Sequence, residues 1–155
     1  MEVALRAVRS LGNRERLSVC GKTTARDDQH VVDDNGEGII FSGADGVASD
    51  NANVYDNLLT GAVLRHDAES WYPAGNPVGT GNQLHNNCLW GGAEGPIDTS
   101  SGGFTATNNM IVDPQYVNAA DYDYHLQPTS PCLAFTGDIA ASVDGTTRQH
   151  RPTAP

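Results

Sequence analysis

The residues best suited to chemistry lie in one stretch, LRHDAESWYP, at positions 64–73. Arg65, His66 and Asp67 supply a fixed cation, a group that titrates near neutral pH and a carboxylate. Asp34 and Asp56, in the segments VDDN and VYDN, add two more carboxylates in a shared local pattern. Hydrolysis of a glycosidic bond needs two carboxyl groups beside it, and elimination from a uronic acid needs a base and a group that neutralises the sugar carboxylate. These five residues are therefore the candidate catalytic set, with Arg65 as the key cation for a lyase.

The same stretch also suits binding without catalysis. Trp71 and Tyr72 can stack on a sugar ring while Glu69 accepts hydrogen bonds from its hydroxyls. His85 and Trp90 follow in the next part of the chain and are expected to flank this site. The five residues Glu69, Trp71, Tyr72, His85 and Trp90 are thus the candidate substrate-binding set. In the alternative interpretation, Trp71 and Tyr72 fold back and cover the scaffold.

Other chemistries find little support in the sequence. It has no Gly-x-Ser-x-Gly, P-loop, His-Glu-x-x-His or Cys-x-x-Cys motif. The segments DDNGEG (33–38) and SDNAN (49–53) offer oxygen atoms that Ca²⁺ could use, but neither has the EF-hand spacing. No residue is therefore assigned as a metal ligand, and Ca²⁺ is the one cofactor that we consider.

Charge and hydropathy narrow the range of partners. The net charge is -10, and residues 27–155 hold seventeen of the nineteen acidic residues with only three of the nine cations. Nucleic-acid binding depends on Lys and Arg that neutralise phosphates, so nucleic acid is not expected as a partner. No apolar run reaches the length of about 18 residues needed for a membrane span, and the first residues lack the apolar region of a signal peptide.

The number and spacing of the cysteines do not decide whether the cellular compartment is oxidising or reducing. Cys20, Cys88 and Cys132 form neither a metal-binding pair nor an even disulfide set. We expect Cys88 to point into the core, with pairing to Cys132 as the alternative.

A repeat sets the expected scaffold. The segments VDDN, VYDN, LHNN and ATNN end at Asn35, Asn57, Asn87 and Asn109, with separations of 22, 30 and 22 residues. The longer interval is a repeat with an inserted loop, expected near 65–80. Such a pattern, with Asn at the turns, predicts stacked short parallel strands whose Asn side chains bond from one coil to the next. The expected inward residues are Val32, Ile40, Val54, Leu58, Val63, Leu84, Leu89, Ile97 and Ile111. A β-sandwich is the alternative fold.

The end of the sequence resembles a known family. The run DPQYVNAADYDYHLQPTSPCLAF (113–135) and the phrase DIAASVDGTTRQHRP (138–152) are similar to the end of right-handed parallel β-helix proteins of the pectate-lyase-like superfamily. Matching positions include Asp113, Pro114, Tyr124, Pro131 and Cys132. The resemblance implies a mostly extracellular location and a polysaccharide partner, although such a fold supports many activities.

Together these observations predict an all-β, right-handed parallel β-helix, a solenoid of few coils. Residues 1–28 form a terminal cap, with a short helix, or part of a truncated coil. Residues 29–112 form the coils, and residues 113–155 form a C-terminal cap segment. The expected function is a carbohydrate-associated binding or scaffold module of an extracellular or cell-surface protein, monomeric or a fragment of a longer chain. The alternative is a polysaccharide lyase or glycoside hydrolase acting on an acidic polysaccharide.

Overall fold

The protein belongs to the all-β class. A computed structural model describes residues 17–19, 26–28 and 31–133, and all structural statements refer to these residues. The side chains before residue 31 are not described. The expected N-terminal helix and residues 134–155 of the expected cap segment lie outside the described part.

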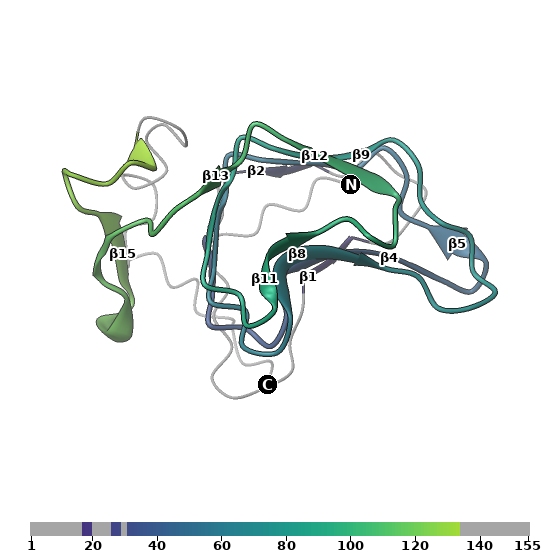
Figure 1. The fold of residues 1–155 in the computed structure, drawn as a ribbon, viewed down its shortest axis with the longest axis horizontal. Helices are drawn as coiled ribbons and strands as arrows, with labels where there is room; N and C mark the ends of the chain where they lie inside the picture. The colour runs from purple at the N-terminus through teal and green to yellow at the C-terminus, as the bar shows by residue number, and fades with distance from the viewer. Residues whose placement is uncertain (1–16, 20–25, 29–30, 134–155) are drawn as a thin grey trace, which may run out of the picture.

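Most strands belong to three parallel sheets, named here sheets A, B and C (Figure 1). Sheet A contains β3 (Val31–Asp33), β7 (Leu58–Thr60), β10 (Cys88–Trp90) and β13 (Met110–Ile111). Sheet B contains β1 (Leu17–Val19), β4 (Ile39–Ala44), β8 (His66–Trp71) and β11 (Gly95–Asp98), and β5 (Val47–Ala48) pairs antiparallel with β4. Sheet C contains β2 (Arg26–Asp28), β6 (Asn53–Tyr55), β9 (Asn82–His85) and β12 (Phe104–Thr107).

The chain contributes strands to these sheets in a fixed order. It runs from sheet C to sheet A to sheet B three times, as β2-β3-β4, β6-β7-β8 and β9-β10-β11, and then enters β12 and β13. Each such run through the sheets is called a pass. Within each sheet, every strand pairs in parallel with the strand from the next pass. Each pass therefore lies directly over the one before it.

The observed register corrects one member of the predicted repeat. Val31 pairs with Leu58, Leu58 with Cys88, and Cys88 with Met110. Asn57 precedes its sheet A strand, whereas Asn35 follows β3 and accepts a hydrogen bond from the amide of Val63. Asn35 thus belongs to a different turn from Asn57, and the prediction that the two are equivalent is wrong. The two turns look alike in the sequence because both bury an asparagine side chain.

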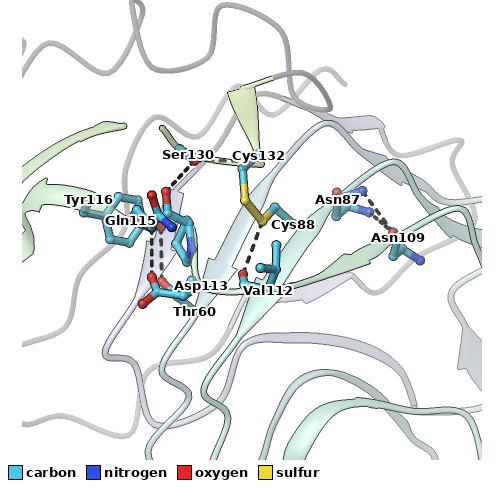
Figure 2. Close-up of a disulfide and its surroundings, with 11 residues drawn as sticks. Thr60, Asn87, Cys88, Asn109, Val112, Asp113, Gln115, Tyr116, Ser130 and Cys132 are labelled. Atoms are coloured by element: carbon cyan, nitrogen blue, oxygen red, sulfur yellow. Dashed lines mark hydrogen bonds between the residues drawn. A yellow bond between two sulfur atoms is a disulfide. The ribbon is translucent and has the colours of Figure 1, made fainter. Parts of the chain in front are cut away.

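The other three asparagines form the expected ladder. Both the backbone amide and the side-chain amide of Asn57 donate to Oδ1 of Asn87, each at 3.0 Å. Asn87 donates in the same way to Oδ1 of Asn109, again at 3.0 Å (Figure 2). Asn57 and Asn87 are fully buried. Since buried polar groups are costly unless they are bonded, this ladder fixes the turn between sheets C and A in successive passes.

The main core lies between the three sheets. It includes Val32, Leu59 and Leu89 from sheet A, Ile39, Phe41 and Ala68 from sheet B, and Val54, Leu84 and Phe104 from sheet C. The rings of Phe41 and Phe104 stack with centroids 4.6 Å apart. The inward prediction is confirmed for Val32, Val54, Leu84 and Leu89, and Ile97 packs against the same core.

Four predictions about buried positions are corrected. Val63 and Ile111 are about half exposed, at 52% and 47%. Leu58 and Cys88 are buried, but they join a second cluster with Val31 on the other face of sheet A. Neighbouring residues of a strand point to opposite faces, so Leu59 and Leu89 face the main core while Leu58 and Cys88 face away from it.

The C-terminal segment covers this outer face of sheet A. Strands β14 (Tyr116–Asn118) and β15 (Asp123–Leu126) form an antiparallel pair around a short 3₁₀ helix, Ala119–Asp121. Figure 1 shows β15 beside the stacked passes, on the side where β13 lies. Tyr124, Leu126 and Cys132 pack there against Val31, Leu58 and Cys88. The described part of the expected cap segment therefore lies on the side of the stack.

A disulfide joins the C-terminal segment to sheet A. Cys88 in β10 and Cys132 are bonded, with Cα atoms 6.1 Å apart, and both residues are fully buried (Figure 2). Ser130, two residues before Cys132, donates its hydroxyl hydrogen to the carbonyl of Pro114. The alternative pairing considered for Cys88 is thus the one that forms.

Candidate functional site

Two regions of the described surface hold several of the residues singled out from sequence. One is a charged corner where the chain passes from sheet A into sheet B. The other is the outer face of sheet C with the depression at its edge. The stretch LRHDAESWYP does not form one site: Arg65, His66 and Glu69 belong to the charged corner, whereas Asp67 bonds to backbone amides and Trp71 is exposed at the end of a strand.

The prediction of an inserted loop from about residue 65 is wrong for residues 66–71. His66–Trp71 is strand β8, which pairs with β4 on one side and β11 on the other. The extended connection comes afterwards, between Trp71 and Asn82. Sequence spacing located the extra residues in the correct repeat, but it placed their start several residues too early.

At the charged corner, three side chains surround the carboxylate of Glu69. Its Oε1 lies 2.7 Å from Nε of Arg65, and its Oε2 lies 3.0 Å from Nδ1 of His66. Glu94, from the neighbouring pass, places its Oε2 3.8 Å from the same imidazole nitrogen. Glu69 is 1% exposed, whereas Glu94 is 55% exposed. This set is called the Glu69 cluster.

Glu94 is the residue that sequence reasoning missed. It precedes β11, and the register of sheet B sets the adjacent Gly95 beside His66. The amide of Glu94 also donates to the carbonyl of Arg65. Because 28 residues separate His66 from Glu94, only the stacking register brings the two together.

Asp67 is not part of this cluster, because its carboxylate accepts hydrogen bonds from backbone amides. Its Oδ1 accepts a hydrogen bond from the amide of Ala62 and its Oδ2 one from the amide of Gly92, both at 3.0 Å. Burial raises the pKa of Asp67 to about 6, although the two amide hydrogen bonds act in the opposite direction. Its carboxylate therefore ties the turns of two successive passes together.

Asp34 and Asp56 lie in two different turns. Both have left-handed backbone conformations, with φ of 54° and 56°. Asp34 follows sheet A, where its amide donates to the carbonyl of Thr60, whereas Asp56 precedes sheet A, where its amide donates to the carbonyl of Asn86. The prediction that they share a phase is wrong for the same reason as for Asn35. The five candidate catalytic residues are therefore not brought together.

The outer face of sheet C carries His85. Val54 and Leu84 point into the core, so their neighbours on β6 and β9 point outward. The rings of Tyr55 and His85 stack with centroids 5.4 Å apart, and Nε2 of His85 lies 2.8 Å from Oδ1 of Asn53. The outward residues of β6, β9 and β12, all partly or fully exposed, are Asn53, Tyr55, Gln83, His85, Thr105 and Thr107.

An open depression of about 470 Å³ adjoins this face. Gln83 and Thr105 belong both to its lining and to the sheet face. The remaining lining residues are Gly79, Thr80, Gly81, Asn82, Gly103 and Phe104. The amide of Asn82 donates to the carbonyls of Ser49 and Gly103, which fixes the floor of the depression.

The three candidate aromatic residues, Trp71, Tyr72 and Trp90, do not lie on one surface. Tyr72 folds back, because its hydroxyl oxygen is buried and a Cβ atom on Gly79 would lie only 2.7 Å from it. Trp71, at the end of β8, is 41% exposed, and Trp90, at the end of β10 in sheet A, is 48% exposed. Trp71, His85 and Trp90 thus lie on sheets B, C and A respectively.

Comparison with known proteins identifies no relative. The chain matches no family model, no curated protein and no solved structure. Among the described residues, no helix has the length and apolar character to cross a membrane. The fold and the site define an all-β protein with three parallel sheets, in which the outward side chains of β6, β9 and β12 in sheet C are polar and uncharged.

Proposed function

We propose that this protein is a carbohydrate-binding module built on a right-handed parallel β-helix. The fixed order in which the chain visits sheets C, A and B supports this interpretation, as does the parallel pairing of each pass with the next. The buried ladder of Asn57, Asn87 and Asn109 adds to that support, because stacked asparagines are typical of coiled parallel strands. The resemblance of residues 113–152 to the pectate-lyase-like superfamily suggests the polysaccharide partner.

The observation that carries the proposal is the outer face of sheet C. Its described outward side chains are amides, hydroxyls, a phenol and an imidazole, and none is Asp, Glu, Lys or Arg. Such groups hydrogen-bond sugar hydroxyls, and the strands repeat them at about 4.8 Å along the stack. An extended sugar chain advances by a similar distance for each ring, so it can lie along the stack and meet one strand after another.

This composition favours a neutral glycan as the ligand. The whole chain carries a net charge of -10, which disfavours an acidic polysaccharide, and the face offers no cation on β6, β9 or β12 to offset it. The contact surface proposed here differs from the candidate substrate-binding set drawn from the sequence. His85 is the one residue that belongs to both.

A binding role is favoured over the lyase or hydrolase alternative. Hydrolysis needs two carboxyl groups about 5 to 9.5 Å apart around one bond. Asp34 and Asp56 lie at opposite ends of the sheet A strands, and both oxygens of Asp67 accept backbone amides. No pair among these carboxylates is therefore arranged to act on one sugar linkage.

The disulfide supports an extracellular or cell-surface location. Disulfides persist in oxidising compartments and are rare in the cytosol. The bond between Cys88 and Cys132 is buried and joins two segments that are 44 residues apart, which is typical of a structural disulfide. We therefore propose that the protein functions outside the reducing cytosol.

Binding of the whole chain to a glycan array, followed by affinity electrophoresis in gels containing the best polysaccharides, tests this proposal. We expect retention by at least one neutral glycan and no retention by polyuronates. The variant with both Gln83→Ala and His85→Ala should lose about 1 to 3 kcal/mol of binding free energy, equivalent to roughly 5-fold to 150-fold in affinity. The matched control, His66→Ala, changes a histidine on another sheet and should bind like the parent protein. Absence of glycan binding, or equal affinity of the double variant, would refute the proposal.

A further inference from the structure

We propose that the Glu69 cluster is a binding site for a transition-metal dication of the Zn²⁺ type, with His66, Glu69 and Glu94 as ligands. The imidazole Nδ1 and one oxygen of each carboxylate all lie within 4.8 Å of one another. Zinc binds nitrogen at about 2.0 Å and carboxylate oxygen at about 2.1 Å, so two ligand atoms on a tetrahedral ion are about 3.4 Å apart. The distances from His66 to Glu69 and to Glu94, 3.0 and 3.8 Å, lie on either side of this value.

The state of Glu69 is a separate reason to expect a cation. Its side chain is 1% exposed, and its Oε1 pairs with Nε of Arg65 at 2.7 Å. Its Oε2 accepts a hydrogen bond from the imidazole of His66 at 3.0 Å. Arg65 offsets the charge of Glu69, and a metal ion bound to Oε2 would offset the charge of the second carboxylate, that of Glu94, which lies near the same imidazole nitrogen.

The surroundings keep two of the three ligands in place and leave the third adjustable. His66 and Glu69 belong to β8, which is paired on both sides, so their backbone is fixed. Glu94 is mostly exposed and can rotate toward the ion. Arg65 stays on the far oxygen of Glu69, where it acts as an outer-shell partner that orients the carboxylate.

The kind of ligand atoms selects the kind of ion. Ca²⁺ takes six to eight oxygen ligands in protein sites, whereas imidazole is a ligand for zinc, copper, iron and nickel. One imidazole and two carboxylates supply three ligands, which leaves a fourth tetrahedral position for water or a bound molecule. This inference does not depend on carbohydrate binding, since sheet C lies on a different side of the stack.

The test uses the full chain after treatment with a chelator and dialysis. Titration with ZnCl₂ by calorimetry should show one saturable site per chain, and Co²⁺ should give the visible absorption bands of a tetrahedral ion that Zn²⁺ then removes. His66→Ala should abolish these bands. Glu94→Gln, at an exposed position that is not needed for folding, should weaken Zn²⁺ binding by about 10-fold or more.

The control variant is His125→Ala. His125 also lies beside a carboxylate, that of Asp123, but at an exposed position where the described residues offer no third ligand. It should leave both the stoichiometry and the affinity unchanged. The proposal is wrong if no saturable site is found, if His66→Ala and Glu94→Gln bind zinc like the parent protein, or if Ca²⁺ in millimolar excess displaces Co²⁺ from the site.

Discussion

Reduction of the disulfide between Cys88 and Cys132 should destabilise the protein strongly. The bond closes a segment of 44 residues. In the chain-entropy account of disulfides, a loop of that length restricts the unfolded chain enough to contribute about 4 kcal/mol to the free energy of unfolding. That is a large share of the roughly 5 to 15 kcal/mol by which a domain is stable.

The loss should begin in one region of the structure. The disulfide holds the C-terminal segment on the outer face of sheet A, where Leu126 and Tyr124 pack on Val31 and Leu58. The main core between the three sheets shares none of these residues. We therefore expect amide protons of β14 and β15 to exchange faster in the reduced protein, while those of β7 and β10 stay protected until global unfolding.

Urea unfolding with and without reductant measures the change in stability, and hydrogen exchange with mass spectrometry locates it. The variant Cys20→Ala, which lacks the third cysteine, serves as a control that should retain the full effect of reduction. A stability change below about 1 kcal/mol would refute the entropic argument. Equal loss of protection across all three sheets would refute the prediction that the disulfide mainly stabilises the C-terminal segment.

Two further predictions concern buried polar groups. Replacement of Asn87 by Ala removes the acceptor of the Asn57 amides and a donor to the carbonyl of Val54. Urea unfolding should therefore show a free energy of unfolding that is lower by about 3 kcal/mol. The control variant, Gln83→Ala at an exposed position, should lose less than about 0.5 kcal/mol. A loss as small as that of the control would show that the ladder carries no stability. Because burial raises the pKa of Asp67 from 3.8 to about 6, the folded state binds its proton more tightly than the unfolded state. Stability of the parent protein relative to Asp67→Asn should therefore fall by about 2 kcal/mol as the pH rises from 4 to 6, measured by urea unfolding in EDTA, and a constant difference would contradict this assignment.

Part of the fold could be predicted because a repeat sets the same local geometry several times. The turns at Asn57, Asn87 and Asn109 and the inward positions Val54 and Leu84 follow from residue types and spacing alone. Buried amides need partners, and identical turns stacked in parallel supply them. The all-β class follows from the same reasoning.

The sequence could not predict the candidate sites as groups of residues. Types and spacing singled out Arg65, His66 and Glu69, but not Glu94, which completes their cluster from the next pass. Likewise, His85 was identified singly, whereas its stacking with Tyr55 depends on the pairing of β6 with β9. Neighbours across a sheet are set by register, and register is not visible in the local sequence.

What the sequence by itself determined is the local structure of this protein: short strands, asparagine turns and an apolar residue facing inward at alternate positions. The tertiary structure alone decided the register between successive passes. This register places Asn35 and Asp34 in the turn after sheet A, whereas Asp56 lies in the turn before it. It also decided that Cys88 faces away from the main core, toward Cys132. The physical reason is that strand pairing and side-chain packing act between residues 22 to 44 positions apart, and each pass can shift to bury its own apolar side chains.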